Sequence, residues 1–374
     1  MKVSKLWALI ASSLFIFILS ACAGVIDTGT LFLSLSDATT AEYNAVYVTI
    51  QEVQVHTDEG GNWQRVASPN KTYNLLELVN GVREQLGITE LETAHYTQMR
   101  LIIGKSPDDT INLLSERHPY ANYIIDKADT YYELKIPSGY QTGIKIVHGF
   151  DITENQTTEL ILDFDASRSI VKAGNSGQWL LKPTVKVLDT ADYSIISGTV
   201  IALDAEGVLV SAQVYDPGAD DEKDSVVIQA STIADENGFY TIFLHPGTYN
   251  IVAYKDGYNP ECGKISLASN SSYIQDFTLN ATSSGEITGI VSIADGDEEQ
   301  YVTLSFRQSA QCEDSTEEEI IEVQSLNIAD NTQYNLSLSE GTYSVVVSTY
   351  GKETKTDDNI KITTDTVTPL NISF

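Results

Sequence analysis

LHPGTYNIV at residues 244–252 and LSEGTYSVV at residues 338–346 decide the fold of the C-terminal half of this chain. In both stretches a glycine and, two places later, a tyrosine stand at the start of an apolar run. The glycine allows a tight turn into a strand, and the tyrosine can bury its ring while its hydroxyl reaches a nearby backbone group. We therefore predict a structural device here and not a functional site.

The two stretches belong to an internal repeat. ISGTV at residues 196–200 corresponds to ITGIV at 287–291, and NGFY at 237–240 corresponds to NTQY at 331–334. Turn residues recur every ~8–12 positions, which is typical of a β-sandwich of about seven strands. A looser copy, LETAHYTQM at residues 91–99, predicts a distantly similar sandwich in the N-terminal half.

Strand patterns extend over most of the remaining sequence. LFLSL at residues 31–35 and AVYVTIQEVQV at 45–55 alternate apolar and polar residues with the period of half-buried strands. Only residues 75–86 space their apolar residues as in a helix, and Gly81 weakens that prediction. We predict a mainly all-β fold of tandem Ig-like or transthyretin-like sandwiches, with at most one or two short helices in the first domain.

The N-terminus has the layout of a signal peptide, with Lys2 and Lys5 before an apolar stretch at residues 6–19. That stretch is shorter than the ~20 residues that span a bilayer. LSAC at residues 19–22 resembles the bacterial lipobox, which implies cleavage before Cys22, acylation of this cysteine and anchorage in a lipid bilayer. A plain secretory signal is the alternative. Ala23 replaces the aspartate typical of inner-membrane retention, which favours the outer membrane.

These patterns divide the chain into five segments. We expect a signal peptide at residues 1–21, a lipidated tether at 22–29, a β-rich domain at 30–189, a sandwich at 195–281 and a divergent second sandwich at 286–374. We expect the domains to form a rod that leads away from the membrane.

The charge of the chain restricts its partners. There are 52 acidic and 22 basic side chains, and the formal net charge is -30. Such a surface repels phosphate groups, so we expect no nucleic-acid partner. The five histidines have no metal-ligand spacing, and no nucleophile motif is present, so we predict that the protein is not an enzyme.

Asp163 and Asp165 are the weak candidates for a metal site. In a strand both carboxylates lie on one face and Phe164 on the other, and with Ser167 they could hold Ca²⁺. We favour a turn-capping role, with no cofactor. Three acidic segments are also weighed as calcium loops and interpreted as solvated loops: residues 216–224, 295–299 and 313–319.

Cys262 and Cys312 remain once Cys22 is acylated. A disulfide between them would link the two repeated sandwiches and restrict their relative motion, but two unpaired thiols are the preferred interpretation. Several aromatic residues could present ring faces to sugars, although most of them are expected in the core. They are Trp63, Trp179, Tyr120, Tyr123, Tyr131 and Tyr132.

Two family resemblances follow from these residues. SGTV at 197–200, DENGFY at 235–240, PGTY at 246–249 and the Gly257-Tyr258 pair resemble the carboxypeptidase regulatory-like domain, which implies a transthyretin-like accessory module. Residues 29–188 resemble domain-of-unknown-function family 4382, which implies an architecture but no chemistry. The matching segments are LSLSD at 33–37, YVTI at 47–50, NLLELVNG at 74–81, YTQMRL at 96–101, LDFD at 162–165 and LKP at 181–183.

Three functional hypotheses follow. The first is a non-enzymatic binding or adhesion lipoprotein of the bacterial envelope, with a glycan or another envelope protein as partner, and it predicts an exposed aromatic platform or ligand groove. The second is a structural lipoprotein that bridges to another envelope protein, and it predicts a large apolar or strand-edge patch. The third is an enzyme, which requires a deep pocket with converging titratable groups.

Overall fold

The computed structural model describes residues 27–38, 40, 42–57, 62–136, 143–173, 178–190, 193–294 and 300–374. Cys22, the predicted signal peptide and the acidic segment 295–299 lie outside these ranges. Strands dominate the described residues, and the helical segments are single turns: η1 (Leu75–Glu77), α2 (Ala166–Ser169) and η4 (Glu222–Asp224). The all-β prediction is therefore confirmed. Within the described ranges we find no apolar helix of membrane-spanning length.

The first sandwich packs two sheets around one core. One sheet has the order β14-β11-β1-β5, with β1 parallel to β11, and the other has the order β10-β6-β2-β7-β8-β13-β12. Its strands are β1 (Thr28–Ala38), β2 (Tyr43–Thr57), β3 (Gln64–Ala67), β4 (Lys71–Asn74), β5 (Glu84–Glu92), β6 (Ala94–Ile103), β7 (Asn122–Asp126), β8 (Tyr131–Lys135), β9 (Ile144–Ile146), β10 (Phe150–Ile152), β11 (Thr157–Asp165), β12 (Ile170–Ala173), β13 (Gln178–Leu181) and β14 (Val185–Asp189).

The core of the first sandwich follows from the period-two pattern. Leu31, Leu33 and Leu35 of β1 point to the same side and are buried. The end of β11 is buried on both faces, from Leu160 to Asp165. Because strands covered on one side only alternate in burial, this end of β11 must be covered on its outer face as well.

The second and third sandwiches share one topology, as the repeat predicts. In the second, β18-β15 with β21 and β22 faces β17-β16-β19-β20, and in the third, β26-β23 with β29 and β30 faces β25-β24-β27-β28. The strands are β15 (Ser194–Ile201), β16 (Leu209–Tyr215), β17 (Val226–Ile233), β18 (Phe239–Leu244), β19 (Gly247–Tyr254), β20 (Glu261–Leu267), β21 (Ser272–Ile274), β22 (Phe277–Thr278), β23 (Ser284–Ser292), β24 (Tyr301–Ala310), β25 (Glu319–Ala329), β26 (Gln333–Ser339), β27 (Gly341–Thr349), β28 (Lys355–Ile362), β29 (Val367–Pro369) and β30 (Ile372–Ser373).

The predicted tyrosine device is present in all three sandwiches. The hydroxyl of Tyr249 donates to the carbonyl of His245 at 2.9 Å, and that of Tyr343 donates to Ser339 at 2.7 Å. In the first sandwich Tyr96 reaches the carbonyl of Glu92 at 3.2 Å. Each hydroxyl thus bonds the carbonyl four residues upstream and fixes the turn before its strand, which confirms the structural interpretation.

The helix predicted over residues 75–86 is wrong. The structure has the 3-10 turn η1, and the strand β5 already begins at Glu84. Asn80 and Gly81 have φ angles of 55° and 81°, which no α-helix accommodates. The leucines of this segment occupy a short turn that reaches the core, and their spacing only resembles that of a helix.

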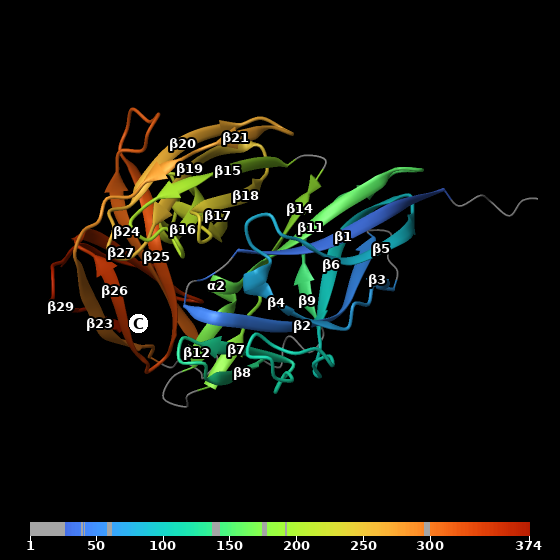
Figure 1. Cartoon of the computed structure of the whole chain (residues 1–374), viewed down its shortest axis with the longest axis horizontal. Coiled ribbons are helices and arrows are strands. Elements are labelled where there is room, and N and C mark those ends of the chain that lie inside the picture. Colours follow the sequence, from blue (N-terminus) through green and yellow to red (C-terminus); the bar gives the residue numbers. More distant parts are fainter. Residues whose placement is uncertain are drawn as a thin grey trace, which may run out of the picture.

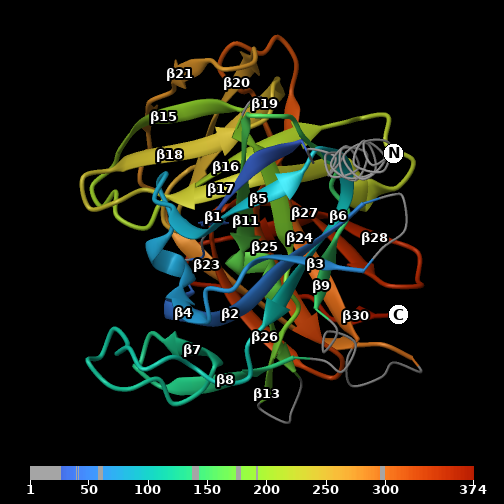
Figure 2. The ribbon, with the colours of Figure 1, turned by 90° about the vertical axis from the view of Figure 1, so that its right-hand side faces the viewer.

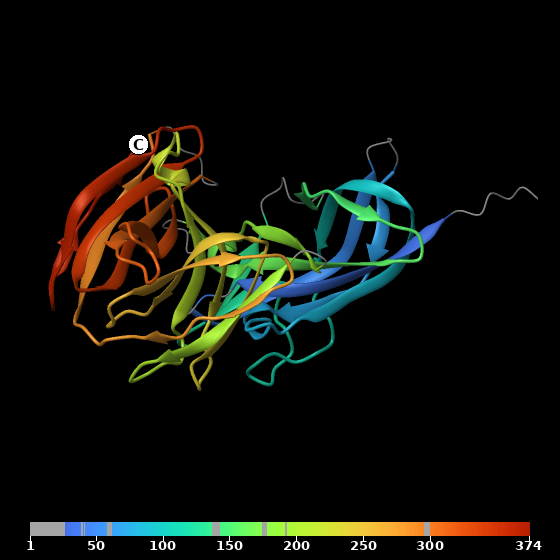
Figure 3. The same ribbon diagram turned by 90° about the horizontal axis from the view of Figure 1, so that it is seen from above.

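The predicted rod is also wrong. Figure 1 shows the third sandwich at the left, the first at the right and the second above them, and Figure 3 confirms that the second lies beside both. In Figure 2 the β7–β8 hairpin lies at the end of the first sandwich away from β15 and β18. β12 pairs with β25 at Lys172 and Ile328, beside a small apolar cluster of Val171, Leu180 and Ala329. A rod would leave these lateral contacts in water.

Candidate functional site

Asp163 and Asp165 lie at the end of β11, where the first sandwich meets the other two. Asp165 caps α2, since its side chain accepts hydrogen bonds from the Arg168 amide at 3.1 Å and from the Ser167 hydroxyl at 2.6 Å. Phe164 between them is fully buried in the core. The structure thus assigns the capping role to Asp165, whereas the Asp163 carboxylate faces Ser36.

Asp163 belongs to a buried group of carboxylates. It accepts a hydrogen bond from the Ser36 hydroxyl at 2.9 Å, and Asp37 accepts one from the Ala166 amide at 3.0 Å. Burial raises the pKa of Asp163 to about 6, against the hydrogen bond from Ser36. Burial and repulsion from Asp163 and Asp165 raise the pKa of Asp37 well above its usual range. These carboxyl groups therefore hold protons more tightly than exposed ones do.

Lys186 of β14 connects this group with the second sandwich. Its ammonium donates to the backbone carbonyls of Ile228, at 2.7 Å, and Gln229 in β17. Burial lowers the pKa of Lys186, and the nearby charge of Arg168 lowers it further. The lysine therefore serves as a contact between sandwiches, next to carboxylates that partly compensate its charge.

The described residues contain no group of three or more His, Cys, Asp or Glu side chains arranged to hold a metal ion. Asp37 and Asp163 line a cavity of only about 20 Å³, which is room for a single water molecule. The acidic segments 216–224 and 313–319 are occupied by contacts within the molecule. Asp221 caps η4, and Glu319 accepts a hydrogen bond from Ser315 at 2.9 Å. No calcium site is proposed.

The aromatic candidates form no exposed platform. Trp63 packs against Arg100, 4.4 Å from its ring, and Trp179 packs edge-on against Tyr43 and near Tyr132. Tyr123 is fully buried and stacks on Tyr47. The remaining two, Tyr120 and Tyr131, lie at the edge of this cluster, beside Tyr123.

The histidines lie apart in the described structure, with one exception. His95 bonds Asp151 at 2.7 Å, and His118 bonds Tyr123 at 2.8 Å. His148 and His245 line the same cavity of about 400 Å³ between the first and second sandwiches. Burial lowers the pKa of His148, and the charge of His245 lowers it further. No serine, threonine or cysteine lies among the residues that line this cavity.

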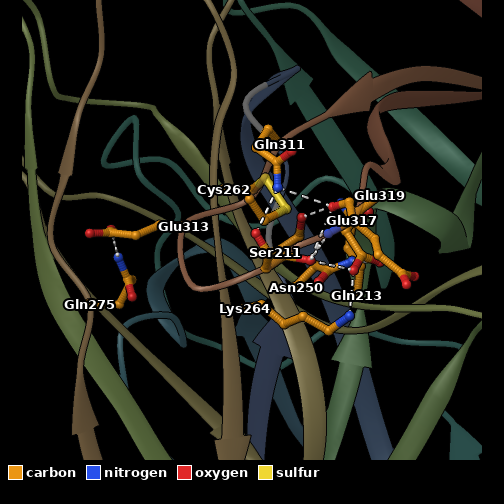
Figure 4. Close-up of a disulfide and its surroundings, with 12 residues drawn as sticks. Ser211, Gln213, Asn250, Cys262, Lys264, Gln275, Gln311, Glu313, Glu317 and Glu319 are labelled. Atoms are coloured by element: carbon orange, nitrogen blue, oxygen red, sulfur yellow. Dashed lines mark hydrogen bonds and ion pairs between the residues drawn. A yellow bond between two sulfur atoms is a disulfide. The ribbon is translucent and has the colours of Figure 1, made fainter.

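Cys262 and Cys312 form a disulfide, so the preference for two free thiols is wrong (Figure 4). The two repeats bring β20 and the segment after β24 side by side. The Glu313 amide donates to the Cys262 carbonyl, and the Lys264 amide donates to the Glu313 carbonyl, both at 2.8 Å. Sequence alone could not show this proximity, because the cysteines occupy unequal positions in the repeat. Lys264 also pairs with Glu319 across the same contact.

Arg307 is an interface residue that the sequence analysis missed. Its side chain is almost completely buried, and it belongs to β24 of the third sandwich. Its guanidinium donates to the Glu222 carbonyl at 2.9 Å, the Lys223 carbonyl at 3.2 Å and the Ser225 hydroxyl at 2.8 Å in the second sandwich. In the sequence Arg307 occupies a polar position of an alternating strand, residues 302–307, so nothing there signals its burial.

Two amide side chains complete the contacts between sandwiches. Gln213 of β16 exchanges two hydrogen bonds with the backbone of Glu322 in β25, at 2.6 and 2.9 Å. Asn80 of the first sandwich accepts from the hydroxyl of Thr232 at 3.0 Å and from the amide of Thr241 at 3.3 Å. The second sandwich is therefore held to both others by polar contacts.

These features define an all-β protein with tandem sandwiches joined at a polar junction. Residues 28–183 match the model of a family described as a domain of unknown function (DUF4382), which confirms the resemblance of the first sandwich. Asn80 lies in one of the matching segments. No curated protein is significantly similar to the chain.

Several solved structures resemble the chain at low identity. The Bacillus anthracis TIE protein is 12% identical, with 93% of this chain and 50% of that one covered and a TM-score of 0.20. The streptococcal ancillary pilin is 10% identical, with 92% and 99% covered and a TM-score of 0.20. The shaft pilin SpaA from Lactobacillus rhamnosus GG is 10% identical, with 49% and 98% covered and a TM-score of 0.19. The chain thus spans half of the Bacillus anthracis protein.

Proposed function

We propose that the chain is a membrane-anchored lipoprotein of the bacterial cell envelope that acts as a non-enzymatic binding or adhesion protein. In this proposal acylated Cys22 holds the chain at a bilayer, with the outer membrane favoured. The second and third sandwiches are carboxypeptidase regulatory-like modules, and a glycan is a candidate partner. The strongly acidic surface argues against a nucleic-acid partner.

The observation that carries this proposal is the set of three contacts that fix the second sandwich against the third. A disulfide, the guanidinium of Arg307 and the amide of Gln213 all cross from the second sandwich to the third. The disulfide is a covalent restraint, and breaking the bonds of Arg307 or Gln213 would leave buried polar atoms without partners, so these groups hold the two sandwiches in one orientation. A fixed arrangement suits a protein that presents a surface to a partner.

The titratable groups support a non-enzymatic role. Asp37 and Asp163 face a cavity for one water molecule, and Asp165 caps a helix. Catalysis by acid and base groups requires room for a substrate between them. Asp37 and Asp163 have no such room.

The anchor is tested at its cysteine. Mass spectrometry of the mature N-terminal peptide is expected to find acyl chains on Cys22, and the Cys22→Ser variant is expected to leave the membrane fraction. Cys262→Ser is the matched control, because it changes a cysteine without touching the N-terminus. Equal membrane partitioning of the Cys22→Ser variant and the parent would contradict the anchor.

A structural lipoprotein that bridges to another envelope protein is the second candidate. Ile201, Leu203 and Phe239 are 59%, 92% and 57% exposed at one end of the second sandwich. In the third sandwich Ser292 and Gln333 occupy the positions of Ile201 and Phe239, so this fold does not require apolar residues there. Asp204 and Glu206 are exposed next to Leu203, and their carboxylates favour a protein partner with an apolar contact and a basic rim.

Exchange between the repeats tests the second candidate. Ile201→Ser with Phe239→Gln gives the second sandwich the side chains of the third, and folding is expected to be unaffected. Crosslinking in intact cells is expected to trap one envelope protein with the parent and to lose it with the double variant. Equal crosslinking of parent and double variant would exclude this surface.

A further inference from the structure

A cavity of about 290 Å³ lies where the three sandwiches meet. The first sandwich contributes Arg168 and Thr184 to its wall, the second contributes Lys223 of η4, and the third contributes Arg307 and Ser348. The volume lies at the lower end of the ~300–1,000 Å³ that small-molecule sites occupy. The cavity therefore has room for a small ligand, unlike the space beside Asp163.

The charges around this cavity are already compensated within the molecule. Arg168 lies 3.7 Å from a carboxylate oxygen of Glu322 and 3.7 Å from one of Asp165. Lys223 pairs with Asp221 at 3.2 Å. Arg307, which donates to several carbonyl and hydroxyl groups, lies 3.4 Å from a carboxylate oxygen of Glu222. With each cation paired, the cavity attracts neither anions nor cations strongly.

Hydroxyl groups complete the lining. Thr184, Ser325 and Ser348 line the cavity, and their hydroxyls make no hydrogen bond within the described part of the chain. A hydroxyl can both donate and accept, and so can the hydroxyl groups of a ligand. The lining is therefore complementary to a ligand that carries several hydroxyl groups and no net charge.

The cavity has a buried floor and an accessible mouth. Arg307 and Glu322 at the floor are 2% and 7% exposed. The side chains of Lys223 and Asp224, on η4, are 42% and 61% exposed. A ligand can therefore enter beside η4 and reach fixed polar groups, which the contacts between the sandwiches hold in place.

We propose that this junction cavity binds a neutral polyhydroxylated molecule of monosaccharide size, either a free sugar or the terminal residue of a glycan. The inference rests on the binding role proposed above and gives that role a site. The site belongs to no single sandwich, because all three sandwiches contribute polar side chains to it.

Ligand-observed NMR on the full chain tests the site, in a detergent without a sugar head group. The probes are D-glucose, D-galactose, D-mannose and N-acetyl-D-glucosamine, with D-glucuronic acid as the anionic comparison. At least one neutral sugar is expected to bind, and more tightly than glucuronic acid. Binding of the same chain to immobilised glycans distinguishes a free sugar from a terminal glycan residue. If the site takes terminal residues, the chain is retained only by glycans that end in the sugar that binds in the NMR experiment.

Two variants locate the binding. Ser348→Leu fills part of the cavity and is expected to weaken binding at least tenfold. Thr184→Val keeps the side-chain shape, removes one hydroxyl and is expected to weaken binding about threefold. Ser337→Leu, on the exposed face of β26 in the same sandwich, is the matched control and should bind as the parent does.

Three results would overturn the site: binding of none of the probes, tighter binding of glucuronic acid than of every neutral sugar, or parental affinity in both cavity variants. The parental thermal midpoint in Thr184→Val would show that any loss of binding is not a loss of folding. An acylated Cys22 in a chain that binds no sugar would contradict the site while the anchor stands.

Discussion

The titration of Asp163 affects the stability of the fold. Its pKa is raised to about 6 in the folded chain from an ordinary value of 3.8, so the folded state binds this proton more tightly than the unfolded state does. The stabilisation from this proton is complete below pH 4 and is lost as the pH rises through 6. Near neutral pH the buried carboxylate therefore destabilises the fold.

We predict that Asp163→Asn is more stable than the parent at pH 7.5, by roughly 1 to 3 kcal/mol, and that the difference shrinks at pH 4.5. Asparagine keeps the acceptor for Ser36 and removes the titration. Urea unfolding at the two pH values measures the effect. Asp109→Asn, with its side chain in solvent, is the control. Parallel pH profiles for Asp163→Asn and the parent would contradict the role of this carboxyl group.

A second prediction concerns the hydroxyl group of Tyr343. Its hydroxyl, inside the third sandwich, donates to the carbonyl of Ser339 at 2.7 Å. Tyr343→Phe keeps the ring and leaves that carbonyl without its donor, so we expect a loss of about 1 to 2 kcal/mol in the free energy of unfolding. Tyr350→Phe, at a ring that is 94% exposed, should change stability by less than about 0.5 kcal/mol. Equal effects of the two changes would contradict the structural role of the hydroxyl.

At the scale of the element, β15 and β23 show why each repeat retains a glycine near its start. Gly198 faces Tyr240, and Gly289 faces Tyr334. A Cβ atom at Gly198 would lie 1.9 Å from the carbonyl oxygen of Gln275, which also accepts the hydroxyl of Tyr240. The backbone at Gly198 therefore lies too close to the backbone at Gln275 for any side chain to fit between them.

We expect Gly198→Ala to cost about 3 kcal/mol or more, because the added methyl group meets backbone and not a movable side chain. Limited proteolysis and urea unfolding measure the loss. Gly218→Ala is the matched control, since the only neighbour of its added methyl group within 4 Å in the described part of the chain is a side-chain oxygen of Asp216, at 3.3 Å, and not backbone. A Gly198→Ala variant as stable as this control would show that the two segments can separate without cost.

Strands and turns were predictable where interactions between neighbouring residues determine them, and less predictable where contacts with distant residues do. Period-two alternation identifies β1 and β2, and the shared Gly-Thr-Tyr identifies β19 and β27, because each pattern has one local interpretation. The segment at residues 75–86 failed because Asn80 and Gly81 turn the chain with positive φ angles. The Asn80-Gly81 pair, a dipeptide typical of turns, is the signal of that turn in the sequence.

Contacts across the junction were the least predictable part of the site. Asp165 shows its capping role in sequence, because a helix cap acts over three residues. Arg307 and Cys312 act on residues 50 or more positions away, and the pattern near each of them resembles an ordinary strand end. Without the relative placement of the sandwiches, neither contact follows from composition or spacing.

At the scale of the whole molecule, the second and third sandwiches are held by two independent kinds of contact. The disulfide joins Cys262 to Cys312, 50 residues apart, and constrains the unfolded chain as well as the folded one. Arg307 acts in the folded state only, by satisfying the carbonyls of Glu222 and Lys223. Loss of the disulfide should therefore lower global stability and leave the orientation, whereas loss of the disulfide together with the bonds of Arg307 and Gln213 should release it.

We predict that Cys262→Ser with Cys312→Ser lowers the free energy of unfolding by about 2 to 4 kcal/mol, while the radius of gyration in solution scattering stays that of the parent. Arg307→Met and Gln213→Leu added to this pair remove two further polar contacts between the sandwiches and should increase the radius of gyration, because the two sandwiches can then separate without unfolding. Arg307→Met alone is the control and should leave the radius unchanged. An expanded profile for the cysteine pair alone would mean that the disulfide by itself sets the orientation, and that the buried guanidinium contributes nothing to it.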